Sequence, residues 1–224
     1  MFGVSMPVKA VIFDLDETLI HSNIDFKRMK ERVITFLERN GVTRGLLNLR
    51  MLNVEITRLA VKDLQEKGFS EDQIKEIFSQ VTKIMNQTEI ESLDGARPID
   101  GAFETLSYLK KKGIKIGVMT RSCREYTERA LSKSGLKRFV DVISARDDVD
   151  KPKPDPEHAR HVLKLLGVKA EDAVFVGDHW LDCLCAKKAG LRFILVSRKD
   201  FDKKTPAGHD FENVKDIKEI MGKI

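Results

Sequence analysis

One short apolar run that ends in two aspartates constrains the fold of this chain more than any other feature. Residues 11–19 read Val-Ile-Phe-Asp-Leu-Asp-Glu-Thr-Leu. A continuous apolar run bounded by polar residues is typical of a strand buried in a parallel sheet. Because side chains alternate along a strand, Asp14 and Asp16 should point to one side, and Phe13 and Leu15 to the other.

The two aspartates are expected to share one small volume where this strand ends. Aspartate is disfavoured in strands, so a chance pair of surface acids is a weaker explanation. Two neighbouring carboxylates repel each other unless a cation or a shared proton relieves the repulsion. The pair therefore predicts a metal site, an acid/base pair, or both.

Length and composition favour an enzyme-sized protein of the cytoplasm. The chain has 224 residues, of which 42% are hydrophobic, enough for one large domain or one domain with an insertion. No stretch approaches the roughly 20 apolar residues of a membrane span, and Met1 to Pro7 lack the pattern of a secretory signal. The three cysteines, at positions 123, 183 and 185, lack metal-ligand spacing and fit a reducing compartment.

The charge balance would suit anionic partners, although charges of both signs spread over helix faces explain it more simply. A formal net charge of +5 favours anionic small molecules. Nucleic acid is not expected as a partner, because charges of both signs are interspersed and aromatic residues are sparse. We expect a monomer or a homodimer that does not bind a membrane.

The chain between residues 22 and 96 has the pattern of a small helical bundle. Apolar residues recur there at helical spacing, and Ser70 with Gln73 forms a capping box at the start of the third helix. We therefore expect residues 22–96 to form a helical cap domain, inserted after the first strand into a core made of residues 1–21 and 97–224.

From Pro98 onwards, short apolar strands alternate with helices. The expected strands are 114–119, 139–144, 173–176 and 193–196. This alternation predicts an α/β fold with a Rossmann-like parallel sheet that helices cover on both faces. Ligands of such sheets bind beyond the carboxyl ends of the strands. The insertion leaves from the first of these ends, so we expect it to lie over the site as a lid.

Several polar residues follow directly after predicted strands, although they are far apart in the sequence. Four segments contain them, and their order and spacing resemble the haloacid dehalogenase superfamily in its phosphatase branch. The segments are Asp14-Leu-Asp-Glu-Thr18, Met119-Thr-Arg-Ser122, Lys151-Pro-Lys-Pro-Asp155 and Gly177-Asp-His-Trp-Leu-Asp182. The size and place of the insertion resemble those of phosphoglycolate phosphatases.

The resemblance implies roles for the two aspartates of the first segment. Asp14 matches the family's nucleophile, which accepts a phosphoryl group; a carboxylate can attack phosphorus to form an aspartyl phosphate. Asp16 matches the acid/base residue, which protonates the leaving oxygen and then activates water, and its backbone carbonyl also reaches the metal. The dehalogenases and phosphonatases of the superfamily lack an aspartate at that position, so they are less expected.

The second and third segments imply contacts to phosphate. Thr120 matches a hydroxyl that binds a phosphate oxygen, although a strand-terminal threonine also serves to cap the following helix. Arg121 stands where the family often has Asn; it would bind phosphate or a substrate carboxylate, or be an ordinary surface residue. Lys151 matches the lysine that precedes Pro-x-Pro and would neutralise phosphate beside Asp14. Lys153 competes if the register slips by two, but the two prolines favour Lys151.

The fourth segment implies a magnesium site. Asp178 would bind Mg²⁺ together with Asp14 and the carbonyl of Asp16, and Asp182 would support the metal or Lys151 from behind, or cap the helix. His179 would line the pocket. His158 and His161 have helical spacing, but without further ligands we expect them to be exposed residues and not a zinc pair.

These observations together predict a Mg²⁺-dependent phosphatase that acts on a small phosphorylated metabolite. Two alternatives remain open at this point. A phosphomutase of the same superfamily would use the same four segments. A binding module that keeps the fold and uses its basic surface would need no catalysis, and the acid/base aspartate argues against it.

Overall fold

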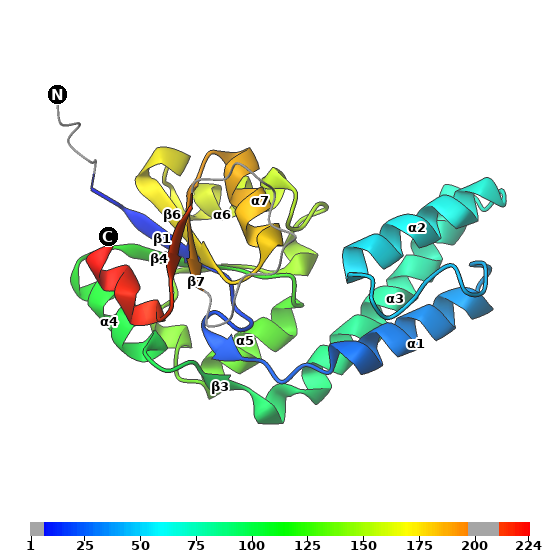
Figure 1. Ribbon diagram of the computed structural model, residues 1–224, viewed down its shortest axis with the longest axis horizontal. Coiled ribbons are helices and arrows are strands. Elements are labelled where there is room, and N and C mark those ends of the chain that lie inside the picture. The colour runs from blue at the N-terminus through cyan, green and yellow to red at the C-terminus, as the bar shows by residue number, and fades with distance from the viewer. Residues whose placement is uncertain (1–6, 197–210) are drawn as a thin grey trace. The chain divides into compact units, whose positions relative to one another are not determined.

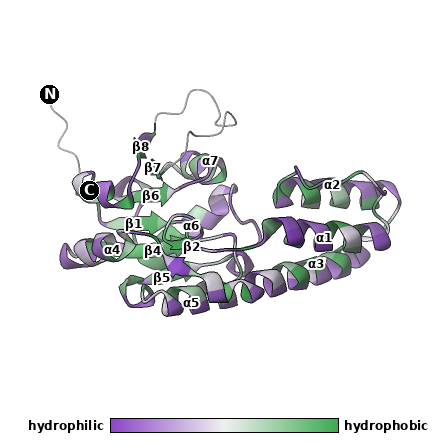
Figure 2. Ribbon diagram, turned by 60° about the horizontal axis from the view of Figure 1, so that its bottom comes forward, coloured by the Kyte–Doolittle hydropathy of each residue, from purple (hydrophilic) through white to green (hydrophobic). Residues whose placement is uncertain are grey.

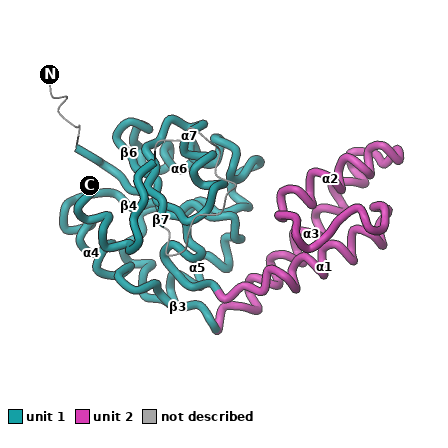
Figure 3. The backbone as a smooth tube through the Cα atoms, viewed as in Figure 1, with its two compact units in different colours: residues 1–22, 95–224 teal, residues 23–94 magenta. Residues whose placement is uncertain are grey.

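The computed structural model describes residues 7–196 and 211–224, so Met1–Met6 of the stretch examined for a signal lie outside it. The chain divides into two compact units (Figure 3). A helical unit comprises Asn23–Asp94, and a core unit comprises the described residues on either side of it. The sequence pattern predicted an insertion at 22–96, so its limits differ from those of the helical unit by one residue at the start and two at the end.

A six-stranded parallel sheet forms the centre of the core unit, in the order β5-β4-β1-β6-β7-β8 (Figure 2). Every neighbouring pair in this sheet is parallel. The strands are β1 (Ala10–Phe13), β4 (Lys115–Met119), β5 (Val142–Ser144), β6 (Ala173–Gly177), β7 (Arg192–Val196) and β8 (Glu212–Val214). The predicted α/β fold with a parallel sheet core is confirmed.

The register of the central strands brings their carboxyl ends level with one another. Phe13, the last residue of β1, is paired with Val118 of β4 and with Val176 of β6. The chain order also reverses beside β1, since β4 and β5 extend to one side and β6 to β8 to the other. Ligands of open α/β sheets bind at such a switch point. The residues that follow these three strands therefore meet at one place.

Helices cover the sheet on both faces. They are α4 (Ala102–Lys111), α5 (Arg124–Lys133), α6 (Pro156–Leu166) and α7 (Trp180–Ala189). Side chains of α6 and α7 share one apolar cluster with Ala10 and Ile12 of β1, and Figure 1 shows α4 on the opposite side of the sheet. Since both faces are covered, the central strands β1, β4 and β6 are apolar along almost their whole length, as their green colour in Figure 2 shows.

Two details of the sheet differ from the expected strands. The strand expected at 139–144 is shorter, because residues 137–139 form a 3₁₀ turn before β5 begins at Val142. The edge strand β8 was not predicted, since the sequence Glu-Asn-Val shows no apolar run. A further short pair, β2 (Ile20–His21) with β3 (Arg97–Pro98), is antiparallel and joins the two places where the chain leaves and re-enters the core unit.

The helical unit is a three-helix bundle with its own apolar core. Its helices are α1 (Phe26–Arg39), α2 (Asn53–Glu66) and α3 (Glu71–Glu91). Buried apolar residues from all three, among them Leu37, Ile56 and Val81, form one cluster. Ser70 and Gln73 make the predicted capping box at the start of α3, with reciprocal hydrogen bonds of 3.3 and 2.9 Å. Among the described helices, none has the length and apolar character needed to cross a membrane.

Candidate active site

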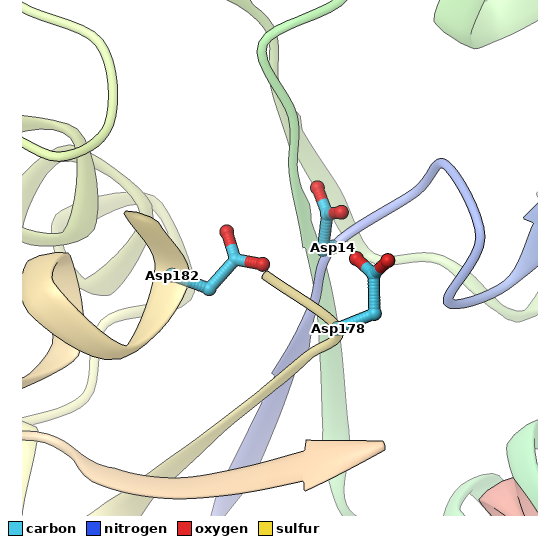
Figure 4. A group of neighbouring side chains, drawn as sticks. All are labelled: Asp14, Asp178 and Asp182. Carbon is cyan, nitrogen blue, oxygen red and sulfur yellow. The ribbon is translucent and has the colours of Figure 1, made fainter. Parts of the chain in front are cut away.

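The candidate site lies at the carboxyl ends of β1, β4 and β6. Asp14 follows β1, Thr120 follows β4, and Asp178 follows β6. Asp182 reaches the same place from the first turn of α7, as Figure 4 shows. Carboxylate oxygens of Asp14, Asp178 and Asp182 all lie within 4.8 Å of one another.

A buried lysine connects two of these three carboxylates. The Nζ atom of Lys153 lies 2.6 Å from Oδ1 of Asp14 and 2.7 Å from Oδ1 of Asp182. Its side chain is only 3% exposed. The second oxygen of Asp182, Oδ2, accepts the backbone N–H of His179 at 3.1 Å and thereby caps α7. Asp182 thus contacts Lys153, and not Lys151 as expected, and it also takes part in the cap of α7.

The prediction that Lys151 is the lysine beside Asp14 is wrong, because Lys153 occupies that place. Lys151 is exposed, whereas Lys153 makes the contacts that Lys151 was expected to make. The sequence Lys-Pro-Lys-Pro-Asp-Pro contains Lys-Pro-x-Pro twice, at 151–154 and at 153–156. The start of α6 selects the second copy, because Asp155 is its N-cap and Pro156 its first residue. Lys153 therefore stands two residues before the cap, where its side chain turns inward.

Gly177 allows Asp182 to approach the end of β6. A Cβ atom at position 177 would lie 2.5 Å from Oδ2 of Asp182 and 2.8 Å from its Cβ and Cγ atoms. Such distances are far inside van der Waals contact, so a side chain here would displace Asp182. The fourth segment thus has glycine at position 177 because a larger residue would clash with Asp182.

Asp16 lies beside this cluster and faces a group of hydroxyls. Its Oδ2 accepts from Oγ of Ser122 at 2.7 Å and from Oγ1 of Thr120 at 3.3 Å, and its Oδ1 from the hydroxyl of Tyr126 at 3.4 Å. β1 ends at Phe13, so the two aspartates are on the loop that follows it. Their carboxylates therefore have different partners, Lys153 for Asp14 and these hydroxyls for Asp16.

The electrostatics of the cluster favour a bound cation. Burial raises the pKa of Asp14 well above its ordinary value, and Lys153 opposes this shift. Burial, followed by the charge of Asp182, raises the pKa of Asp178 to about 7. Burial lowers the pKa of Lys153, but the charges of Asp14 and Asp182 outweigh it, so that the pKa lies above its ordinary value and the amine stays protonated. Three carboxyl groups thus face one ammonium group, and a bound cation would favour the ionised form of the two whose pKa values are raised.

The donor set of the cluster fits Mg²⁺. This ion prefers oxygen ligands, usually one or two carboxylates together with water and substrate phosphate. Two of the predicted ligands, Asp14 and Asp178, present carboxylates at this place. The third was the backbone carbonyl of Asp16, and the Asp16 side chain is not in the three-carboxylate cluster. Asp182 shares an oxygen with Lys153, which suits a supporting residue better than a ligand.

Other residues singled out in the sequence have structural contacts. Thr120 is buried, and its Oγ1 accepts the backbone N–H of Ser122 at 3.0 Å. The guanidinium of Arg121 donates to the backbone carbonyl of Lys153. His179 is the N-cap of α7, where its Nδ1 accepts the backbone N–H of Leu181.

The sequence predicted that His158 and His161 are exposed. For His158 this is wrong: its side chain is fully buried, because the start of α6 packs it against the loop that contains Lys153. His161 is half-buried, with its Nδ1 2.8 Å from Oγ of Ser144.

Sequence reasoning missed the contacts of Ser122, Tyr126 and His158 with this site. Ser122 is part of the second segment, and its position two residues after Thr120 was a usable signal. Tyr126 lies in the first turn of α5, so only the packing of that helix brings its hydroxyl to Asp16. The second Lys-Pro-x-Pro copy was the signal for Lys153.

Comparisons with known proteins agree with this geometry. Residues 11–196 match the family described as haloacid dehalogenase-like hydrolase. The pyrophosphatase PpaX of Halalkalibacterium halodurans is 29% identical over 222 residues, which cover 97% of this chain and 98% of that protein.

Solved structures have the same fold at low sequence identity. CbbY from Rhodobacter sphaeroides, in complex with phosphate, has a TM-score of 0.64 and 21% identity, over 95% of this chain and 96% of that one. A protein from Haemophilus somnus named as a predicted phosphoglycolate phosphatase has a TM-score of 0.65 and 20% identity, over 96% and 97%. At these identities the likeness establishes the fold.

Proposed function

Because this chain belongs to the haloacid dehalogenase-like hydrolase family, we propose that it is a Mg²⁺-dependent phosphatase of small phosphorylated compounds, which acts through an aspartyl phosphate. One observation carries the proposal. The carboxylate of Asp14 lies at the end of β1 in contact with the buried ammonium group of Lys153, and the carboxylate of Asp178 is within 4.8 Å. A nucleophile, a fixed cation and a candidate metal ligand thus surround one point.

In the first step, the Asp14 carboxylate attacks the phosphorus atom of the substrate. A bond forms between the carboxylate oxygen and phosphorus, and the bond from phosphorus to the leaving oxygen breaks with its electron pair. Asp16 in its protonated form gives its proton to that oxygen, which leaves as an alcohol from a phosphate monoester or as phosphate from pyrophosphate. The ammonium group of Lys153 counters the negative charge of the phosphoryl oxygens next to Asp14.

In the second step, water hydrolyses the aspartyl phosphate. Asp16, now a carboxylate, takes a proton from the water as the water oxygen bonds to phosphorus. The bond between phosphorus and Asp14 breaks, which restores the Asp14 carboxylate and releases inorganic phosphate. The hydroxyls of Ser122 and Thr120 hold the Asp16 carboxylate in place for both proton transfers.

Asp14, Asp178 and the backbone carbonyl of Asp16 would hold the Mg²⁺ ion. When bound, Mg²⁺ supplies Lewis-acid stabilisation of negative charge on phosphate oxygens. The excess of carboxylates over ammonium groups in this cluster supports a divalent cation there.

The names of the relatives suggest which substrates to try first. One is a pyrophosphatase and another is named as a phosphoglycolate phosphatase, so inorganic pyrophosphate and 2-phosphoglycolate belong at the head of a panel with sugar phosphates and an aryl phosphate. Both small compounds carry a phosphoryl group on an oxygen, as the mechanism requires.

Phosphate release from this panel, with and without Mg²⁺, tests the proposal. We expect turnover by the wild-type protein only with Mg²⁺, and a loss of at least about 1,000-fold in the Asp14→Asn variant, whose amide is a poor nucleophile. The variant should keep the wild-type circular dichroism spectrum, since the substitution preserves the shape of the side chain. Appreciable turnover by folded Asp14→Asn would refute Asp14 as the nucleophile, and a silent wild type would refute phosphatase activity on these compounds.

A further inference from the structure

The backbone of Lys153 is held on both sides by side chains from other elements. Its N–H donates to Nδ1 of His158 at 3.1 Å. Its carbonyl accepts from the guanidinium of Arg121, on the loop that follows β4. Both peptide groups next to Lys153 therefore have fixed partners.

The imidazole of His158 connects this loop to the end of β5. Its Nε2 lies 3.1 Å from the backbone carbonyl of Ser144, the last residue of β5. Because Nδ1 accepts an N–H, the ring proton must be on Nε2, which donates to that carbonyl. The same carbonyl also accepts the backbone N–H of Thr120 at 3.0 Å. A chain of hydrogen bonds thus runs from the backbone of Thr120 to the backbone of Lys153.

The position of the Lys153 backbone sets where its ammonium group lies. The side chain is buried, and its Nζ donates hydrogen bonds to the carboxylates of Asp14 and Asp182, at 2.6 and 2.7 Å. A lysine side chain has several rotatable bonds, so its end group is precise only if its starting point is fixed. Misplacement of a catalytic group by about 1 Å is enough to lower a rate about a hundredfold.

We propose that His158 is a positioning residue that holds Lys153 in register with Asp14 by tying the Lys153 backbone to the end of β5. The full burial of the ring fits this role, because it can bond only to the groups around it. That this positioning matters for phosphoryl transfer rests on the function proposed above; the backbone contact itself does not.

Three substitutions separate the two hydrogen bonds of the ring. His158→Asn keeps an acceptor at the place of Nδ1 and loses the donor to Ser144. His158→Gln keeps a donor near the place of Nε2 and loses the acceptor for Lys153. His158→Leu removes both. Leu166→Ala is the matched control, since Leu166 is buried on the same helix about 12 Å further along and should lower the melting temperature without touching the loop.

We expect kcat to fall about 10- to 100-fold in His158→Gln and His158→Leu, with KM changed less than about threefold. His158→Asn, which keeps the bond to Lys153 but not the one to Ser144, should have a kcat between those of wild type and His158→Gln, and Leu166→Ala should stay within about twofold of wild type at a temperature where it is folded. Wild-type kcat in folded His158→Gln would overturn the proposal, and so would an equal fall in Leu166→Ala.

Hydrogen exchange at the Lys153 amide decides the question without any activity. The Lys153 amide should exchange slowly in wild type and in His158→Asn, and faster in His158→Gln and His158→Leu, with the amides of α6 unchanged. Equal protection in all four proteins would overturn the contact. If the wild type hydrolyses none of the substrates, the phosphatase proposal fails, while this measurement still tests His158.

Discussion

Lys153 places its ammonium group between the carboxylates of Asp14 and Asp182, and its side chain is only 3% exposed. In a buried ion cluster the loss of one partner costs more than the intact pair contributes, because the remaining charge has no compensation. Lys153 is therefore important for both the stability of the core unit and the proposed chemistry.

Replacement of Lys153 by Met should lower both stability and rate. We expect a loss of about 3–5 kcal/mol in the free energy of unfolding, since two buried carboxylates lose their counter-ion, and a fall in kcat of about 100-fold or more. Lys151→Met is the matched control: its side chain is exposed, so stability should change by less than about 0.5 kcal/mol. Urea unfolding and steady-state kinetics measure the two effects. Similar kinetic losses in both variants would contradict the assignment of Lys153.

His158 should make the stability of the core unit depend on pH. Burial, with the charges of Lys153 and Arg121, lowers the pKa of His158 to about 3 in the folded protein. An unfolded histidine has a pKa of about 6.5, so the unfolded chain takes up a proton first as the pH falls. This contribution is complete above about pH 6.5 and is lost between there and about pH 3. At pH 5 the loss is about 2 kcal/mol.

Urea unfolding at pH 7 and pH 5 measures this contribution in wild type and in His158→Asn. The variant lacks the titrating ring, so its stability should fall less between the two values, by about 2 kcal/mol. An identical pH dependence in both proteins would show that His158 is protonated in the folded state or exposed.

At the scale of elements, the fourth segment brings Asp182 to Lys153 because the end of β6 and the start of α7 lie in close contact. β6 ends at Gly177, and Asp182 in the first turn of α7 folds back over it to reach Lys153. The same aspartate caps the helix that carries it. The geometry of this strand-to-helix connection therefore positions both the cap and the partner of Lys153.

A methyl group at position 177 should disturb this connection. In Gly177→Ala, the new Cβ would lie 2.8 Å from the Cβ and Cγ atoms of Asp182, so the aspartate must move away. We expect kcat to fall about tenfold or more and the melting temperature to drop. Gly222→Ala is the control, because nothing lies within 4 Å of a Cβ there. A Gly177→Ala protein with the activity and melting temperature of Gly222→Ala would show that Asp182 can shift without consequence.

At the scale of the whole molecule, the two compact units have separate apolar cores. The three helices of the inserted unit share one cluster, and the sheet with α6 and α7 forms another. The proposed metal ligands Asp14, Asp16 and Asp178 all belong to the core unit. A cation bound there should stabilise that unit directly.

Mg²⁺ should raise the melting temperature of the core unit. A ligand at about 100 times its Kd stabilises the folded state by about 2.7 kcal/mol, which corresponds to about 5–10 °C for a unit of this size. The chain has one tryptophan, Trp180 at the start of α7, so its fluorescence reports on the core unit alone. Asp178→Asn removes a proposed ligand and should lose most of the shift. A shift of equal size in that variant would place the ion elsewhere.

The sequence by itself determined the fold class and the residues that gather at the strand ends. Apolar runs and helical spacing are local signals, and a parallel sheet brings its carboxyl ends together whatever its loops contain. For that reason Asp14, Thr120 and Asp178 could be placed at one edge of the sheet from pattern alone, and Ser70 could be recognised as a helix cap.

Only the tertiary structure decided which lysine completes the site and what holds it there. Lys151 and Lys153 occupy equivalent places in overlapping copies of one motif, and the start of α6 determines which of them faces Asp14. The sequence predicted an exposed His158 on a helix, yet the packing of α6 on β5 buries this side chain against the loop that contains Lys153. The local sequence offered both lysines without choosing between them, and the burial of His158 depends on a contact with β5, a segment distant in the chain.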